Sequence, residues 1–205
     1  MAMPKEYRTA KVIEVEAALA KMTSEQKAAL PSLVGGDYRL IGKIVQNFCF
    51  VDLHLRRALA VFHEAKLIPE PHAKGYPDYQ DTNLTTVLAD TLKALKPPPA
   101  DLETVLTFLE AILKMRGYRN LVSHTAGKRF PNADVLVFAG KNERDAQKAM
   151  GHGLDGHRIQ FSVLGRSELE DMLTGLASAE NYFGVKKIPQ WTKDYLKPLQ
   201  ANVAV

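Results

Sequence analysis

The chain has 205 residues, 46% of them apolar, which is enough to fold around a sizeable hydrophobic core. Its 27 basic and 23 acidic residues leave a net charge of +4, so an anionic partner is permitted but a nucleic-acid-coating tail is excluded. The single cysteine, Cys49, excludes an intramolecular disulfide and a four-cysteine zinc site. No apolar run is long enough for a signal peptide or a membrane-spanning helix, so we expect a cytoplasmic protein without membrane contact.

The first segments predict two short helical elements. Residues 6–21 have the pattern of a helix, and Thr23 followed by Gln26 resembles a capping box that begins another turn. Two glycines at 35–36 then predict a break in the chain.

The longest periodic segment, residues 37–66, predicts a central helix, because its apolar residues recur every three or four positions. Residues 68–80 contain three prolines and a glycine, which indicates a loop. A helix over 81–95 follows, ended by the prolines of 96–99.

Asp101 opens the next predicted helix, whose apolar stripe runs from Leu102 to Leu113 and which we expect to stop at Gly127. The period then changes from 3.6 to 2, so residues 134–140 and 157–164 predict two strands, with one helical turn between them. Two further helices are predicted over 166–183 and 189–198.

These elements predict one mainly α-helical domain over residues 1–205. Its bundle core covers about 37–127 and 166–183, and a small two-stranded β-hairpin is inserted at about 133–164.

The stretch RGYRNLVSHTAG, residues 116–127, ends the stripe-bearing helix with polar groups. On a helical wheel with Leu102 at zero, the apolar stripe centres at about 320°, and Arg116 falls at the same angle. Asn120 and Ser123 fall within about 40° of that centre. A cation on the core face is costly unless it is paired, so the cluster is either a satisfied structural network or a site.

Asn120 and His124 stand at i and i+4 and therefore share one face of this helix. Arg119 and His124 are five residues apart, about 140° around the axis, and so flank a groove. Histidine is the side chain whose unperturbed form titrates closest to neutral pH, which suits a general acid or base.

Asp52 lies on the apolar face of the central helix, between Phe48 and Leu55, where a carboxylate requires a cation. One interpretation is an i to i+4 pair with Arg56. The other is that Asp52 faces the later helix and orients Arg119 or His124.

The segment from Arg119 to His124 resembles the R-x(4–6)-H motif of HEPN domains, compact helical bundles in which a polar residue, often asparagine, follows the arginine. The bare spacing is uninformative, since Arg56 and Arg57 also match it with His63; Asn120 and the terminal position carry the resemblance. In many HEPN-like proteins an acidic residue on an earlier helix orients the motif, as Asp52 would here.

This resemblance implies a metal-independent endoribonuclease of the toxin, phage-defence or RNA-processing type. In such an enzyme the 2′-hydroxyl of an RNA ribose attacks the adjacent phosphate and displaces the 5′-oxygen, which leaves a 2′,3′-cyclic phosphate without any metal or cofactor. The predicted catalytic residues are Arg119, Asn120 and His124, supported by Asp52, Ser123 and Arg116. Residues predicted to bind RNA are Lys114, Tyr118, Lys128 and Arg129.

The resemblance also implies a homodimer, in which the second copy supplies another His124, and a possible antitoxin partner. Two alternatives remain from the sequence: a catalytically silent HEPN-like nucleotide- or protein-binding module, and a structural bundle whose polar cluster only locks two helices together. The stretch GHGLDGH at 151–157 has metal-binding residue types, but its three glycines favour a turn.

Overall fold

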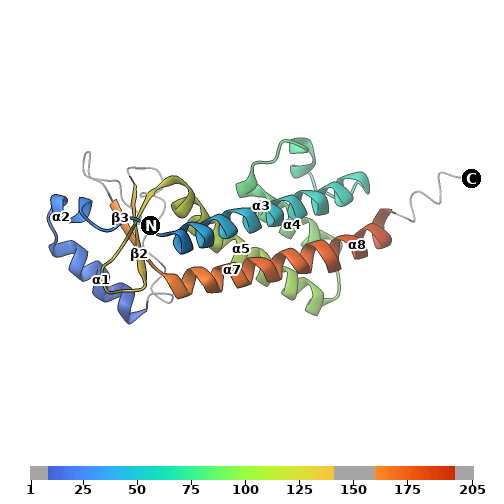
Figure 1. Ribbon diagram of the computed structural model, residues 1–205. Coiled ribbons are helices and arrows are strands. Elements are labelled where there is room, and N and C mark those ends of the chain that lie inside the picture. The colour runs from blue at the N-terminus through green and yellow to red at the C-terminus, as the bar shows by residue number, and fades with distance from the viewer. Residues whose placement is uncertain (1–8, 141–159, 197–205) are drawn as a thin grey trace, which may run out of the picture. The chain divides into compact units, whose positions relative to one another are not determined.

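The computed structural model describes residues 9–140 and 160–196 (Figure 1). The chain forms two compact units, one made of Met1–Val45 and Gly117–Leu173, the other of Gln46–Arg116 and Thr174–Val205. The predicted mainly α-helical class with a small β appendage is confirmed.

The helices are α1 (Ala10–Lys21), α2 (Ser24–Ala28), α3 (Gly35–Glu64), α4 (Asp81–Leu95), α5 (Pro99–His124), α7 (Arg166–Asn181) and α8 (Ile188–Trp191). A 3-10 turn, η2 (His72–Gly75), and two π-helical segments, η3 (Tyr182–Lys187) and η4 (Thr192–Leu196), complete the helical structure. The strands are β1 (Ala126–Arg129), β2 (Val135–Gly140) and β3 (Gln160–Gly165).

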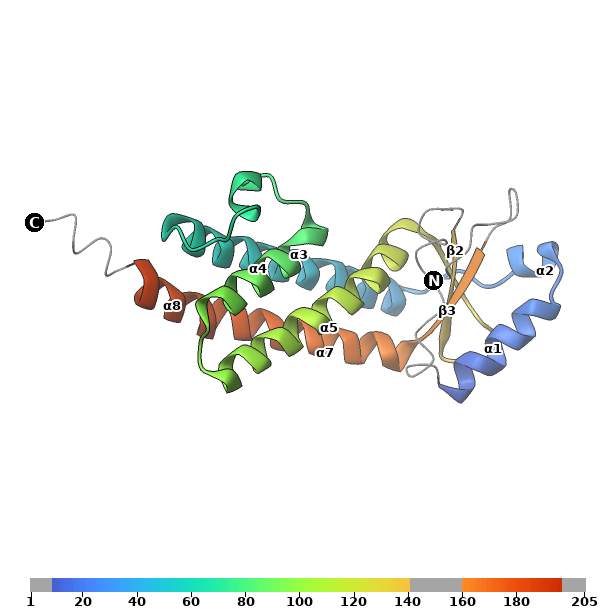
Figure 2. The same cartoon turned by 180° about the vertical axis from the view of Figure 1, so that it is seen from behind.

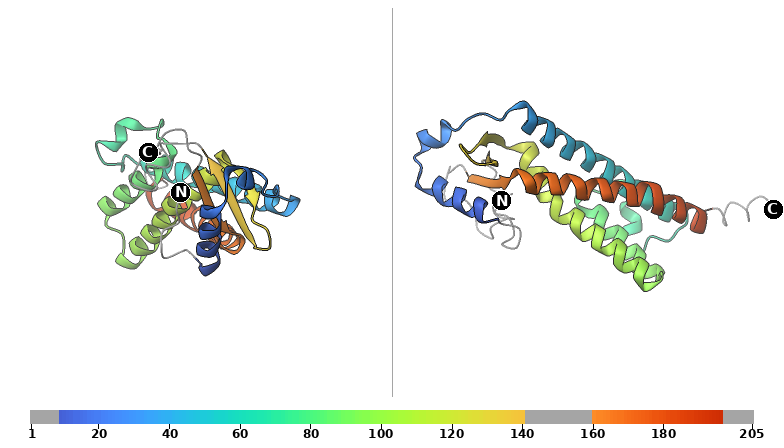
Figure 3. Two further views of the ribbon diagram at one scale, coloured as in Figure 1. Left: turned by 90° about the vertical axis from the view of Figure 1, so that its left-hand side faces the viewer. Right: turned by 60° about the horizontal axis from the view of Figure 1, so that its bottom comes forward.

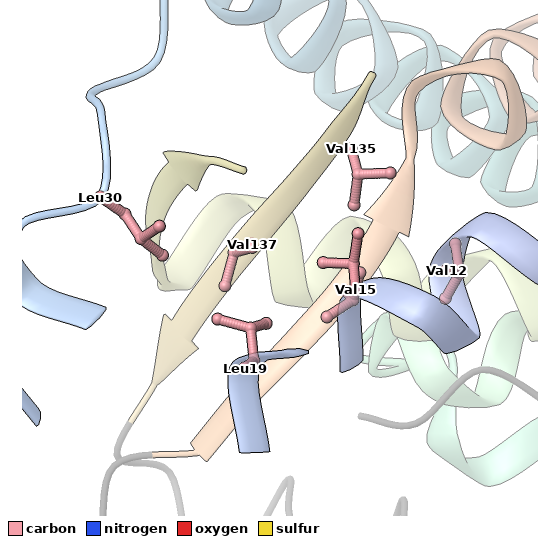
Figure 4. Close-up of a cluster of buried hydrophobic side chains, with 7 residues drawn as sticks. Val12, Val15, Leu19, Leu30, Val135 and Val137 are labelled. Carbon is pink, nitrogen blue, oxygen red and sulfur yellow. The ribbon is translucent and has the colours of Figure 1, made fainter. Parts of the chain in front are cut away.

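In the first unit, α1 packs against the sheet, as two further views show (Figure 3). Valine and leucine side chains of α1 point toward the valines of β2 (Figure 4). The buried cluster consists of Val12, Val15, Leu19, Leu30, Val135, Val137 and Val163. Val135 and Val137 supply this contact, and the alternate residues Leu136 and Phe138 are buried as well, so both faces of β2 are covered.

Helix α2 begins as its capping residues predict. The Thr23 hydroxyl accepts a hydrogen bond from the Gln26 backbone at 3.3 Å, and the Gln26 side chain accepts one from the Thr23 backbone at 2.8 Å. The predicted capping box is therefore confirmed. Helix α1 starts later than predicted, at Ala10, where Thr9 caps it.

The sheet has three antiparallel strands in the order β1-β2-β3, so the predicted two-stranded hairpin was incomplete. The missed strand, β1, has the sequence AGKR and carries no apolar alternation that would reveal it. Gly127 was expected to stop the helix, but it lies in β1, where it pairs with Phe138 of β2. A Cβ at Gly127 would lie 2.6 Å from the Leu33 side chain, so close packing explains this glycine.

The second unit is helical, built from parts of α3, α5 and α7 with α4, η3 and α8 (Figure 2). Aromatic contacts join its elements: the rings of Phe62 and Trp191 lie 5.1 Å apart, and Phe108 stacks on Tyr182 at 4.4 Å. The fully buried side chains include Phe48, Leu55, Leu59, Phe62, Leu84, Leu88, Ile112 and Phe183. Phe48, Leu55 and Ile112 are among the periodic apolar residues that predicted α3 and α5, whereas Leu113, the last residue of the predicted stripe, is 50% exposed.

Two predicted boundaries were wrong. Gly35 and Gly36 begin α3 instead of breaking the chain, because Asp37 in the first turn accepts a hydrogen bond from the Val34 backbone at 3.0 Å. The predicted stop at Phe183 is absent, since Gly184 continues the helical run through η3. The helical turn predicted between the strands lies outside the described residues.

Within the residues that the structure describes, no helix combines the length and hydrophobicity needed to cross a bilayer.

Candidate functional site

Arg116 and Asp52 form a buried ion pair between α5 and α3 in the second unit. The Arg116 Nη1 and Nη2 atoms donate to the two carboxylate oxygens of Asp52 at 3.1 and 2.6 Å. Arg116 is 5% exposed and Asp52 7%. Two parallel charge-assisted hydrogen bonds between planar groups make this a strong, geometrically specific contact.

The position of Arg116 explains why the apolar stripe turns cationic there. Its guanidinium lies 5.1 Å from the ring centre of Phe48, which covers the charge with an aromatic face. The expectation that Asp52 binds a cation is met by Arg116, a partner that the sequence had not indicated. Because the pair is almost wholly removed from water, Arg116 acts in packing and is poorly placed to bind a phosphate.

Arg119 and Asn120, in the first unit, form a second polar contact one turn further along α5. Arg119 Nη1 donates to Asn120 Oδ1 at 2.9 Å, and both side chains are half-buried. This bond fixes the side-chain oxygen of Asn120 on the guanidinium, which leaves the asparagine amide hydrogens directed elsewhere. Asn120 therefore orients Arg119 in this structure.

His124 is the last residue of α5, and its side chain is exposed. Ser123 is also exposed, and its hydroxyl donates to the Arg119 carbonyl at 2.6 Å, a local helical bond. An imidazole at an exposed helix end can approach a ligand from solvent. The helical rise sets Arg119 and His124 about 7.5 Å apart along the axis.

The residues predicted to bind RNA have different surroundings. Lys114 is exposed and pairs with Glu110 at 2.9 Å, one turn earlier on α5. Tyr118 is half-buried on the same helix, and Lys128 is half-buried in β1, where its backbone bridges to Ser32. Lys114 belongs to the second unit and the other two residues to the first.

Arg129 is part of an ion network around the fully buried Asp37 in the first unit. Its Nε lies 3.6 Å from one Asp37 oxygen, and its Nη2 lies 3.5 Å from Asp134. Arg166 Nη1 donates to the other Asp37 oxygen at 3.0 Å. Two arginines therefore neutralise one buried carboxylate, which ties the start of α3 to β1 and α7.

The sequence missed two buried polar features of the second unit. Lys187 of η3 is 7% exposed, and its ammonium lies 3.3 Å from Asp101 at the start of α5. The neighbouring Tyr182 has its pKa raised to about 12 by burial and by the negative charge of Asp101. A lysine on the core face of a helix would have indicated a buried ion pair. At the regular α-helical spacing Lys187 could not be assigned to that face, because residues 182–187 form a π-helix.

His54 of α3 lies against Gly184 of η3, also in the second unit. A Cβ at Gly184 would come 2.6 Å from His54 Nε2. Within the described residues, the buried Nδ1 atom has no hydrogen-bond partner. Burial lowers the pKa of His54, the nearby Arg57 lowers it further, and Glu180 raises it in part.

In the part of the chain that the structure describes, no three histidine, cysteine, aspartate or glutamate side chains gather as metal ligands. The residues of 151–157, which have metal-binding side chains, lie outside that part.

Comparisons with protein-family models, with characterised proteins and with solved structures found no match.

Proposed function

We propose that the end of α5 is the active site of a metal-independent endoribonuclease. The observation that carries the proposal is the arrangement of Arg119, Asn120 and His124: an oriented arginine and an exposed histidine on successive turns of one helix end. This is the segment whose sequence resembles the HEPN motif. The buried ion pair of Arg116 and Asp52 is assigned a structural role.

In the proposed reaction, the ribose 2′-hydroxyl attacks the adjacent phosphorus and the 5′-oxygen leaves. His124 accepts the proton of the attacking 2′-hydroxyl and donates a proton to the departing 5′-oxygen, a task suited to an imidazole side chain. Arg119 binds the non-bridging phosphate oxygens and stabilises the charge that builds on the phosphorane. Asn120 holds the guanidinium through the bond described above. The products are a 2′,3′-cyclic phosphate and a 5′-hydroxyl end.

One histidine must both accept and donate a proton. A homodimer in which two α5 ends face one shared scissile phosphate would supply His124 twice, so that one imidazole acts as base and the other as acid. The dimer is part of the proposal.

The proposal is tested by incubating the purified protein with end-labelled RNA in EDTA. We expect cyclic-phosphate ends from the unmodified protein. His124→Ala should lower the rate by about 10²- to 10⁴-fold, the usual contribution of a general acid or base. Since His124 is exposed, the substitution should leave the free energy of unfolding unchanged.

The chain offers a matched control in His63, an exposed histidine of α3 that also follows arginines at the motif spacing. His63→Ala should leave RNA cleavage unchanged. Equal losses of activity in the two variants, or cleavage that survives His124→Ala, would reject the catalytic assignment.

A further inference from the structure

A pocket of about 330 Å³ lies at the turn between β1 and β2 in the first unit. Its volume is at the lower end of the range found for small-molecule sites. The lining residues are Pro31, Arg129, Phe130, Pro131, Asn132 and Ala133 with Asp134. Five consecutive residues of the turn, 130–134, therefore form most of its wall.

The backbone fixes the shape of this pocket. Phe130 donates its backbone N–H to the Val135 carbonyl at 3.1 Å, which closes the turn, and Asn132 adopts a left-handed conformation with φ of 57°. The backbone N–H of Arg129 donates to the Pro31 carbonyl at 2.8 Å, and the backbone N–H of Arg166 donates to the Asp134 carbonyl at 3.0 Å. The turn is thus held from both sides before any ligand arrives.

The charges on the pocket wall favour a neutral ligand over a bare phosphate. Arg129 lies beside Asp134 at 3.5 Å and beside the buried Asp37 at 3.6 Å, so its positive charge is already compensated. The wall presents the remaining N–H donors of the Arg129 guanidinium next to the acceptor oxygens of Asp134, whose side chain is 67% exposed. A ligand with adjacent acceptor and donor atoms on one flat edge matches this pair.

We propose that this pocket binds a guanine base. The Watson–Crick edge of guanine carries the O6 acceptor next to the N1–H and N2–H donors, which matches Arg129 followed by the two oxygens of Asp134. Phe130 and Pro131 supply the apolar lining for the flat ring. Adenine presents an acceptor at N1, which would face the carboxylate and be repelled.

That the guanine belongs to an RNA strand rests on the proposed function. His124 and Arg129 are five residues apart, so at most about 18 Å of extended chain separates them. A single strand bound at the motif can place a neighbouring base in the pocket, which would make cleavage selective for sites near a guanosine.

The test is a binding titration with guanosine 5′-monophosphate and adenosine 5′-monophosphate, followed by calorimetry or by NMR. We expect the guanosine nucleotide to bind at least tenfold more tightly, as a bidentate base contact provides. Asp134→Asn should remove this preference. The matched control, Asp171→Asn on the exposed side of α7, should preserve it. Equal affinities, no binding, or an equal loss in both variants would overturn the proposal.

The source of the base is tested with oligoadenylate RNA that carries, or lacks, one central guanosine. Tighter binding of the guanosine-containing strand, lost in Asp134→Asn, supports an RNA ligand; no difference between the strands overturns that part. Nucleotide binding that persists in a protein without cleavage activity would reject the ribonuclease and retain the pocket. Cleavage without a guanine preference would reject the pocket alone.

Discussion

Two arginines of α5, three residues apart, have opposite surroundings. Arg116 is buried and bound by both oxygens of Asp52, whereas Arg119 is half-buried and bound to the neutral amide of Asn120. A guanidinium that a buried carboxylate already compensates has little attraction left for a phosphate, whereas the Arg119 guanidinium is oriented by the neutral amide of its neighbour. Charge type and helical position alone therefore do not separate a structural arginine from a candidate catalytic one.

The largest expected effect on stability is at the buried pair. Arg116→Ala leaves the Asp52 carboxylate buried without its principal cation, so the free energy of unfolding should fall by about 3 to 5 kcal/mol. Urea titration monitored by circular dichroism measures the loss. If the protein unfolds outright, a double variant, Arg116→Met with Asp52→Leu, should recover most of the stability. A loss below about 1 kcal/mol would mean that the pair contributes little.

A smaller loss is expected where α3 packs against the π-helical segment. Gly184→Ala places a Cβ 2.6 Å from the His54 ring, so the imidazole or the helices must shift, at a cost of about 1 to 3 kcal/mol. Gly35→Ala is the matched control, since a Cβ there meets nothing within 4 Å. Thermal unfolding of both variants measures the difference. Equal stability would show that the contact adapts freely.

Arg119→Ala should cost about 1 kcal/mol, because it removes the side-chain hydrogen bond to Asn120 at a half-buried position. The same urea titration applies, and the comparison with Arg116→Ala sharpens the contrast between the two arginines. A loss as large as that of Arg116→Ala would assign Arg119 to the structural network instead.

The smallest effect is the pH dependence at His54. Its pKa is lowered in the folded protein, chiefly by burial, so folding favours the neutral imidazole. The stabilising contribution is present above the ordinary histidine pKa of about 6.5 and is lost as the pH falls through the lower folded value. Unfolding free energies at pH 8 and pH 5 should therefore differ less in His54→Gln than in the unmodified protein. An unchanged difference would contradict this role.

Much of the helical architecture was predictable because apolar residues recur at helical spacing in α3 and α5. Phe48, Leu55 and Ile112 among them are buried, whereas Leu113 at the end of the α5 stripe is 50% exposed. The capping box of Thr23 was equally local. The strand β1 was not predictable, since its four residues take their conformation from pairing with β2 and not from their own pattern. The same holds for η3, where π-helical spacing moves Lys187 onto the buried face.

The candidate site was predictable only in part. The wheel correctly indicated that a cation enters the core at Arg116, but the partner of Asp52 depends on how α3 and α5 pack in the second unit. Arg129 was predicted to bind RNA from its charge alone. Its compensation by Asp37 and Asp134 is a long-range contact that no local pattern reveals.

Arg119 is proposed to stabilise the transition state of RNA cleavage, whereas Arg116 pairs with Asp52 in the core. The most direct measurement is the rate of cyclic-phosphate formation by Arg119→Ala in EDTA, at a concentration of folded protein equal to that of the unmodified chain. We predict a loss of at least about 100-fold, the usual effect of removing a donor from a developing oxyanion, with stability nearly unchanged. A rate within about twofold of the unmodified protein, or an unmodified protein that forms no cyclic phosphate, would contradict the claim.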